Sequence, residues 1–321
     1  MLEMFGQVFP YAIAFTIPLL ITALGALYSE RSGVTNIGLD GLMIMGAFVS
    51  AFTIVTLQDK LDGNLPLWLG ILAAVIAGIL FSLLHAFASI HLNAEQIISG
   101  TAINMIAGAL TIFLARNITG SGNIRIRQGF IPNDIPVLSD IPVIGMFFTK
   151  TYASTWLVLI ILLVATFILY KTPFGMRLRA CGEHPQAADA AGINVYKMRY
   201  IGVMISGAFS ALGGAIIIVT YAGEFTGNVG GLGFLALAAL IFGQWKPLGI
   251  LGATLFFGFA STVANVSQVI PELASIPPVL LKTFPYIMTL IALVIFSKSS
   301  RAPKAVGEPL IKEKDKIFKG L

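Results

Sequence analysis

The sequence predicts an all-α polytopic membrane protein with about nine transmembrane helices. Hydrophobic residues make up 57% of the 321 residues and charged residues only 11%, whereas a soluble domain carries about 25% charged residues. The apolar residues also arrive in long blocks, and a helix needs roughly 20 of them to cross a bilayer core of about 30 Å. Strands of a membrane β-barrel are shorter and alternate, so a barrel is excluded.

The expected spans follow the apolar blocks in order along the chain. They fall at 8–28, 36–57, 66–90, 96–115, 154–170, 201–221, 230–245, 248–267 and 280–297. The second, fifth and seventh blocks are short or interrupted, so eight to ten spans remain compatible with the sequence. The first block is not expected to be a cleaved signal, because Glu3 but no Lys or Arg precedes it. Residues 1–321 are therefore expected to form a single transmembrane domain.

The distribution of basic residues predicts the orientation. If the polar loop 171–200 lies inside, 14 of the 20 Lys and Arg residues are on the inner side, and cytoplasmic loops carry such an excess. We therefore expect the N-terminus outside, the segment 116–153 extracellular, and the basic tail 298–321 in the cytoplasm, solvated or on anionic lipid. The single cysteine, Cys181, excludes an internal disulfide.

Two distant segments share one pattern of an apolar helix, a polar break and a glycine-rich start of a second helix. The segments begin at Tyr11 and Tyr200, and their glycine-rich stretches read NIGLDG from Asn36 and NVGGLG from Asn228. Five spans separate the two segments, so the copies would have opposite orientations. Inverted repeats with interrupted helices are typical of transporters, whose substrate path runs between the repeats. The expected repeats are 8–115 and 201–297, joined by a linking span at 154–170.

Few polar residues interrupt the spans, and these are the candidates for a substrate path. They are Asn36, Asp40, Asn104, Gln244 and Asn265. Amides suit a polar, uncharged ligand, although each could equally form an interhelical hydrogen bond. Asp40 either faces the path or lies near a membrane surface, because a carboxylate in hydrocarbon is costly, and Asn36 is placed to cap the helix that follows it. His85 and His91 lack metal-ligating company and are expected at the membrane interface.

Catalytic motifs are missing from the sequence. It contains no phosphate-binding loop, no Ser-His-Asp arrangement and no zinc-binding helix motif. We therefore expect no catalytic residues, no metal site and no nucleic-acid partner. If transport is active, its energy must come from an ion gradient or from a partner protein.

The polar loop TPFGMRLRACGEHPQAADAAGINVYKMR, residues 172–199, predicts a short helix with a small-residue surface. Gly182 and Pro185 suit a turn before a helix start, and the alanines around Asp189 favour a helix. Asp189 is expected in the first turn, where the helix dipole favours an acid, and Gly192 as a left-handed C-terminal cap. Such a helix could enter a groove on another protein. The basic residues expected to flank it are Arg177, Arg179, Lys197 and Arg199.

The same loop resembles the cytoplasmic coupling loop of permease subunits in bacterial ABC importers. More narrowly, it is similar to the branched-chain amino acid, ribose and nucleoside permease family, which reads T-x-x-G-x-x-x-R-A-x-G-x-N-x-x-A-A-x-x-x-G-I. The matching positions are Thr172, Gly175, Arg179, Ala180, Gly182, Ala187, Ala188, Gly192 and Ile193. His184 stands where the family usually has Asn. The stretches SGVTNIGLDGLMIMGAF and GLGFLALAALIFGQWKPLG resemble two further motifs of this family.

This resemblance implies a type II-like ABC importer permease in the bacterial cytoplasmic membrane. A separate ATP-binding cassette ATPase would bind ATP and Mg and dock on the loop, so this chain would hold no cofactor of its own. The coupling residues would be Gly182, Glu183, His184, Pro185, Ala188, Gly192 and Ile193. A second, unlike permease and an extracellular substrate-binding lipoprotein would complete the importer.

The nearest subgroup is the nucleoside uptake permeases of the guanosine type, with sugars and branched-chain amino acids as alternative substrates. Two different functions also remain open. An ion-coupled secondary transporter would need buried carboxylates, and Asp40 is the single candidate among the polar residues of the spans, which supports this function only weakly. An intramembrane enzyme or lipid-handling protein is disfavoured by the missing catalytic motifs.

Overall fold

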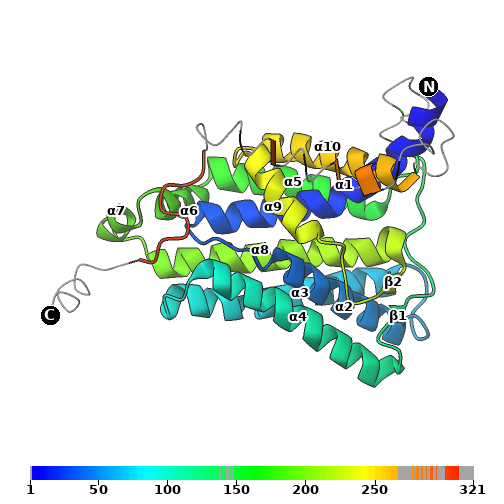
Figure 1. Ribbon diagram of the computed structural model, residues 1–321, viewed down its shortest axis with the longest axis horizontal. Coiled ribbons are helices and arrows are strands. Elements are labelled where there is room, and N and C mark those ends of the chain that lie inside the picture. The colour runs from blue at the N-terminus through cyan, green and yellow to red at the C-terminus, as the bar shows by residue number, and fades with distance from the viewer. Residues whose placement is uncertain are drawn as a thin grey trace.

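The computed structural model describes residues 2–266 apart from several positions between 137 and 147, scattered residues from 277 to 294, and residues 301–310. Within these residues it contains ten α-helices, two π-helical turns and one pair of two-residue strands (Figure 1). The predicted all-α class is confirmed. The strand pair, which no sequence pattern indicated, joins the segment after α4 to the segment after α8.

The elements follow one another with short connections. The first half holds α1 (Leu2–Arg31), α2 (Leu39–Leu57), α3 (Leu65–Ala86), η1 (Phe87–His91), α4 (Gln96–Thr119) and β1 (Ile124–Arg125). The middle holds α5 (Ala153–Lys171), α6 (Pro173–Glu183) and α7 (Pro185–Ala190). The second half holds α8 (Val195–Ile217), η3 (Ile218–Ala222), β2 (Glu224–Phe225), α9 (Leu232–Phe242) and α10 (Pro247–Val266).

Seven helices among the described residues are long and apolar enough to cross a membrane. They correspond to seven of the expected spans. The expected span 230–245 is instead the 11-residue helix α9, which covers only about 16 Å at 1.5 Å per residue. Most of the expected span 280–297 lies outside the described residues.

The two halves of the chain pack in matching order. α1 packs against α10 and α9, as α8 packs against α3 and α2. Helices α2 and α9 both begin inside the molecule, next to each other, and run toward opposite ends (Figure 1). This arrangement is the one that an inverted repeat with interrupted helices predicts.

Small residues allow the central helices to approach closely. A Cβ atom built on Gly214 of α8 would lie 1.9 Å from the carbonyl oxygen of Met43 in α2, so only glycine fits there. Packing of this kind holds helices together in lipid, where apolar burial gives no driving force between them. α8 is therefore the central helix against which α1, α2 and α3 are assembled.

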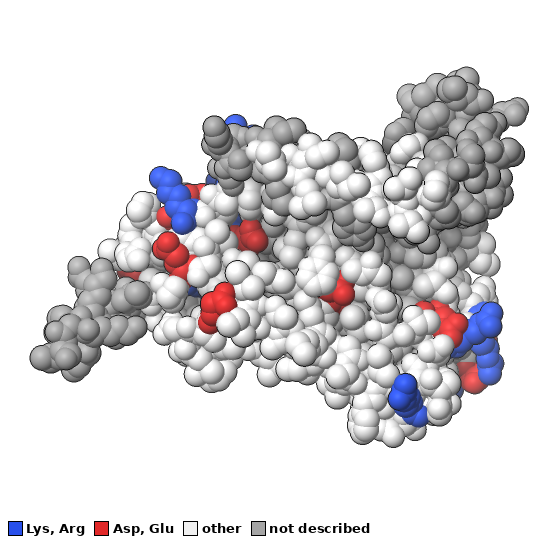
Figure 2. Space-filling model, viewed as in Figure 1, with Lys and Arg blue, Asp and Glu red and all other residues white. Residues whose placement is uncertain are grey.

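The outer surface is that of a membrane protein. On the face drawn in Figure 2, the described Lys and Arg residues gather toward the two ends, and the belt between the ends shows none among the described residues. Large apolar side chains are exposed on the outward faces of α3, α4 and α5. Examples are Leu72, Leu80, Met105, Phe113, Leu163 and Phe167. The chain is therefore a multi-pass membrane protein.

Residues 301–310 of the C-terminal tail pack against the body of the protein near α6 (Figure 1). The Ala305 N–H donates to the carbonyl of Gly182 at 2.9 Å, and the Gly307 N–H donates to that of Gly33 at 3.2 Å. Ala305 and Leu310 are buried. The expectation of a solvated or lipid-bound tail is wrong for this part, because its backbone and apolar side chains find partners within the chain.

Candidate translocation and coupling sites

The two glycine-rich stretches that precede α2 and α9 form the same local turn. The Oδ1 atom of Asn36 accepts from the Gly38 N–H at 3.0 Å, and that of Asn228 accepts from the Gly230 N–H at 2.6 Å. Asparagine favours such turns because its side chain replaces a backbone acceptor. The equivalence of these stretches, inferred from their sequence, is thus matched by equal hydrogen bonding.

Asp40, near the start of α2, connects the first repeat to the start of α9 in the second. Its Oδ1 atom accepts from the Gly233 N–H at the start of α9, at 2.9 Å, and the residue is buried. A carboxylate is favourable at a helix N-terminus, where free N–H groups and the dipole are positive. Gly231, the N-cap residue of α9, has no side chain to do this. Asp40 therefore caps the half-helix of the opposite repeat.

Asn104 fixes the start of α2 from the side of α4. Its Oδ1 atom accepts from the Gly41 N–H at 2.7 Å, and its Nδ2 atom donates to the Ile37 carbonyl at 3.0 Å. The Nδ2 atom of Asn36 donates to the Ser206 hydroxyl of α8 at 3.0 Å. The structure thus brings Asn36 and Asn104 together with Asp40, and their hydrogen bonds hold the starts of α2 and α9 in place.

The remaining two candidates lie elsewhere. Gln244 occupies the turn after α9 with a φ of +52°, and its Nε2 atom donates to the Ile241 carbonyl at 3.1 Å. It therefore ends α9. Asn265, near the end of α10, lines a cavity of about 460 Å³ that it shares with Asn228.

Two polar residues of the interior differ from what the sequence indicated. His85 is fully buried, with its ring nitrogens 3.0 Å from the Ser99 hydroxyl and the Thr35 carbonyl. Its expected place at the interface is therefore wrong. Tyr221, which lines the cavity with Asn265, was missed because a tyrosine near the end of an apolar block is usual at a membrane interface.

Asp40→Asn is expected to keep most of the solute uptake, whereas Asp40→Ala should lose most of it. Asparagine still offers an oxygen to the Gly233 N–H and caps a helix about as well as aspartate. Alanine leaves that N–H without its acceptor. Uptake measured at equal membrane levels of the variants checks this. Equal losses in both variants would show that the charge of Asp40, and not its capping bond, is what transport requires.

The polar loop folds into α6 and α7. Pro185 begins α7 as expected, and Gly192 follows it with a φ of +81°. The Gly192 N–H donates to the Asp189 carbonyl and the Ile193 N–H to that of Ala188, both at 3.0 Å. These two bonds form the expected left-handed C-terminal cap. The placement of Asp189 in the first turn was wrong, because α7 has only six residues and Asp189 falls in its last turn.

The exposed face of α7 differs from the one expected. Ala188 is only 4% exposed, and Pro185 is also buried. Gly182 is packed so closely under α1 that an added Cβ would lie 2.4 Å from the Arg31 carbonyl oxygen. Ala188, Pro185 and Gly182 therefore shape the loop but offer little docking surface. Within residues 184–192, which form α7 and its two ends, the exposed residues are His184, Gln186, Ala187, Ala190, Ala191 and Gly192.

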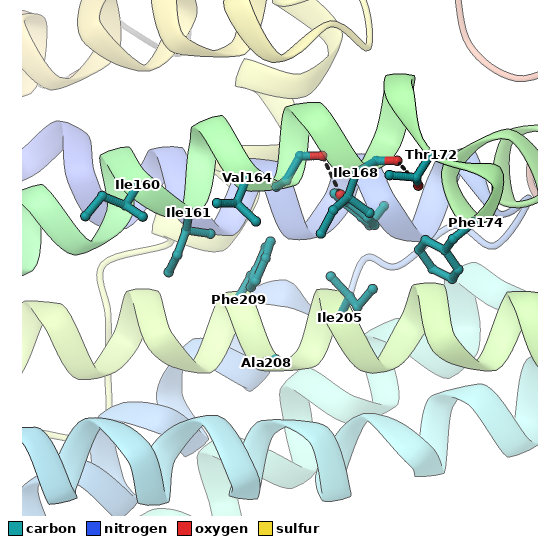
Figure 3. A pocket seen from close by; sticks show the side chains of 11 residues that line it. Ile160, Ile161, Val164, Ile168, Thr172, Phe174, Ile205, Ala208 and Phe209 are labelled. Atoms are coloured by element: carbon teal, nitrogen blue, oxygen red, sulfur yellow. Dashed lines mark hydrogen bonds between the residues drawn. The ribbon is translucent and has the colours of Figure 1, made fainter.

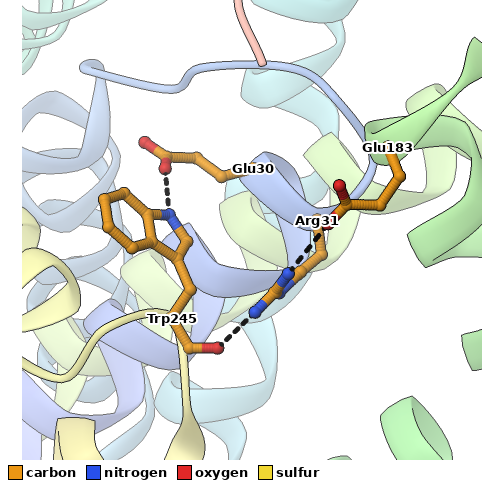
Figure 4. Close-up of polar contacts among 4 residues, drawn as sticks. All are labelled: Glu30, Arg31, Glu183 and Trp245. Atoms are coloured by element: carbon orange, nitrogen blue, oxygen red, sulfur yellow. Dashed lines mark hydrogen bonds and ion pairs between the residues drawn. The ribbon is translucent and has the colours of Figure 1, made fainter. Parts of the chain in front are cut away.

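A network of polar contacts ties the loop to α1 and α9 (Figure 4). The Arg31 Nη1 atom lies 3.4 Å from the Glu183 carboxylate, and its Nη2 atom donates to the Trp245 carbonyl at 2.9 Å. The indole N–H of Trp245 donates to the buried carboxylate of Glu30. α9 is therefore held by Asp40 at its beginning and by this network just after its end.

The flanking arginines are not equivalent. Arg199 is 1% exposed, so the expectation that it flanks the helix at the surface is wrong. The Arg179 guanidinium lies over the Tyr170 ring, 5.0 Å from its centre. Arg177 and Lys197 are exposed and remain available to acidic groups on a partner.

Cys181 is expected to resist thiol reagents near neutral pH. Burial raises the pKa of its thiol to about 11, and only the thiolate reacts. The thiol should therefore stay protonated at pH 7, and the labelling rate should still be rising above pH 9. Maleimide labelling of the purified protein across this pH range is the measurement. Rapid labelling that levels off below pH 9 would contradict the buried position.

A separate cavity of about 680 Å³ lies between α5 and α8 and is unsuited to a polar solute (Figure 3). Its described lining is apolar except for two hydroxyl groups. The Tyr28 hydroxyl donates to the Ala165 carbonyl and that of Thr172 to the Ile168 carbonyl, both at 2.6 Å. Both polar groups are thus already bonded within the chain.

Residues 9–293 match the family model described as branched-chain amino acid transport system / permease component. The guanosine ABC transporter permease protein NupQ of Bacillus subtilis is 48% identical over 97% of this chain and 98% of its own length. The nucleoside ABC transporter permease protein NupC of Lactococcus lactis is 42% identical over 94% and 96%. The glucose ABC transporter permease protein TsgB13 of Haloferax volcanii is more distant, at 26% identity over 75% of this chain and 65% of that protein.

Proposed function

The chain belongs to the permease family of branched-chain amino acid transport systems, and on this premise we propose that it forms the path for nucleosides through an ATP-driven importer. The choice of nucleosides as the substrate rests on the similarity to two nucleoside permeases over nearly the whole chain. The interior supports it, because the polar groups around the starts of α2 and α9 are mainly amides and hydroxyls. Such groups suit a polar, uncharged solute.

The energy source in this proposal is an ATPase subunit that binds ATP and Mg and docks on α7. The exposed small residues of α7 allow close approach, and Arg177 and Lys197 can meet acidic groups beside it. Binding of the ATPase would act on α9 through Glu183, Arg31 and Trp245.

The remaining proposed partners are an extracellular substrate-binding lipoprotein and a second, unlike permease. The lipoprotein would meet the segment 116–153. The second permease would complete the path, as the resemblance to heterodimeric nucleoside importers implies.

The proposed orientation places 116–153 outside and the C-terminal tail inside. A cysteine at Gln128, which is exposed, is therefore expected to react with a membrane-impermeant maleimide in intact cells. Because Cys181 is buried, the native chain serves as the unlabelled control. Labelling of Gln128→Cys only after the membrane is opened would invert the topology.

The uptake experiment compares cells lacking this chain with cells in which it is restored. We expect uptake of labelled guanosine to be lost and then recovered, to fall when ATP is depleted, and to survive collapse of the proton gradient. Labelled glucose and leucine are run as alternative substrates. Unchanged guanosine uptake in the deletion strain would refute the substrate, and uptake that follows the proton gradient would favour an ion-coupled transporter.

A further inference from the structure

We propose that the open cavity of about 460 Å³ lined by residues of α1, α8, α9, α10 and the segment 221–230 is a binding site for a neutral nucleoside within the permease. The residues that carry the proposal are Phe15, Tyr221, Asn228, Ser261 and Asn265. This inference rests on the proposed function. It goes further by locating, within this chain, a site that binds the solute. Its volume lies within the range of small-molecule sites, about 300–1,000 Å³.

The wall of the cavity combines an aromatic surface with polar groups. The rings of Phe15 and Tyr221 stack with their centres 4.4 Å apart and an angle of 26° between their planes. Purine and pyrimidine bases stack on aromatic side chains irrespective of base identity. Asn228, Ser261 and Asn265 add amide and hydroxyl groups that can bond to a base edge or to a ribose.

One polar group of a lining residue has no hydrogen-bond partner among the described residues. The Tyr221 hydroxyl is buried and makes no hydrogen bond to any residue that the structure describes. Buried polar groups in folded proteins are nearly always hydrogen-bonded, so an exception calls for an explanation. In the proposal a small movement of the Tyr221 ring uncovers this hydroxyl, and a hydroxyl or ring nitrogen of the bound solute supplies the missing partner.

The counterpart of Asn228 in the first repeat, Asn36, is buried and bonded to a neighbouring helix. There Asn36 donates to Ser206, and the Gln96 side chain accepts from the Thr35 N–H at 2.7 Å. In the second repeat Asn228, the counterpart of Asn36, makes the same turn bond but lies on the wall of an open cavity. The same turn therefore carries a buried, bonded asparagine in the first repeat and an exposed asparagine on a cavity wall in the second.

The charge of the site selects a neutral ligand. No charged residue is among the described residues that line the cavity, and the carboxylate of Asp40 already occupies the positive end of α9 beside it. A phosphate or carboxylate would meet no cation and would be repelled by Asp40. Nucleosides should therefore enter, whereas nucleotides and amino acids should be excluded.

The test measures binding of labelled guanosine to the complete permease–ATPase complex in lipid nanodiscs, without the lipoprotein. Tyr221→Phe removes only the hydroxyl and should weaken binding about 2- to 12-fold, the range of one hydrogen bond. Asn265→Asp places a carboxylate in the wall and Asn265→Ala removes the amide, and both should also weaken binding. Tyr200→Phe is the matched control, because the Tyr200 hydroxyl lies outside the cavity and contacts His91. Guanosine monophosphate should not compete.

The outcomes separate this site from the proposed function. If the wild-type importer transports guanosine but the Tyr221 and Asn265 variants bind it as the wild type does, the site is refuted and the function stands. Transport without detectable binding to the wild-type complex also refutes the site. Competition by the monophosphate refutes the charge selection. Failure of the wild-type importer to transport any nucleoside refutes the proposed function itself.

Discussion

Gly233→Ala is expected to abolish solute uptake. A Cβ atom at this position would lie 2.2 Å from the backbone nitrogen of Asp40 and 2.4 Å from its Cα atom. Both are main-chain atoms of α2 and cannot rotate away as a flexible side chain could. Overpacking of this kind costs about 1–3 kcal/mol and occasionally more. We expect α9 to move off α2, which breaks the bond between Asp40 and the Gly233 N–H.

The matched control is Gly252→Ala in α10. It makes the same chemical change in a helix, but a Cβ atom there has no heavy atom within 4 Å. This variant should reach the membrane and transport like the wild type. Uptake and membrane level are measured for both variants. Wild-type uptake by Gly233→Ala would contradict the close contact between α9 and α2.

The transmembrane spans could be predicted because hydrocarbon thickness fixes how many apolar residues a helix needs. The half-length of α9 could not, since its apolar run continues almost without a break into the turn at Gln244 and Trp245. The turn is set by left-handed backbone at these two residues, with φ of +52° and +53°. Neither residue type favours that conformation, so no local pattern in the sequence indicates it.

The polar residues at the start of α2 could be predicted because they stand out in apolar surroundings. Their partners could not be identified in the same way. Asp40 and Gly233 are 193 positions apart, and only the packing of two repeats against each other brings them together. The repeat pattern itself did pair Asn36 with Asn228, because the chain needs the same turn before α2 and before α9.

Which side of α7 is buried could not be predicted from the sequence, for a different reason. Six residues make fewer than two helical turns, so no periodic pattern shows which side is buried. Three of the six residues are alanines, and Ala187 and Ala188 cannot be distinguished by chemistry. Their exposure is decided by how α6 fits under α1 at Gly182, which is a tertiary contact.

Ala187→Trp is expected to uncouple transport from ATP hydrolysis while leaving the permease folded. Ala187 is exposed on α7, so tryptophan can be accommodated by the free permease. It would then stand between α7 and the groove of the ATPase. Overpacking of about 1–3 kcal/mol there would weaken docking roughly 5- to 150-fold, since 1.4 kcal/mol is a factor of ten. Uptake and the amount of ATPase retained on the purified permease are the measurements.

Two further variants test whether the effect of Ala187→Trp depends on the exposed side of α7 and on close packing instead of charge. Ala188→Trp places the same bulk on a residue that is only 4% exposed, so it should lower the level of folded permease in the membrane. Arg177→Glu should reduce docking less than Ala187→Trp, because exposed ion pairs contribute only about 0–1 kcal/mol. Normal ATPase retention by a folded Ala187→Trp permease would remove α7 from the docking surface. A larger loss in Arg177→Glu than in Ala187→Trp would show that charge, rather than the fit of small residues, holds the ATPase.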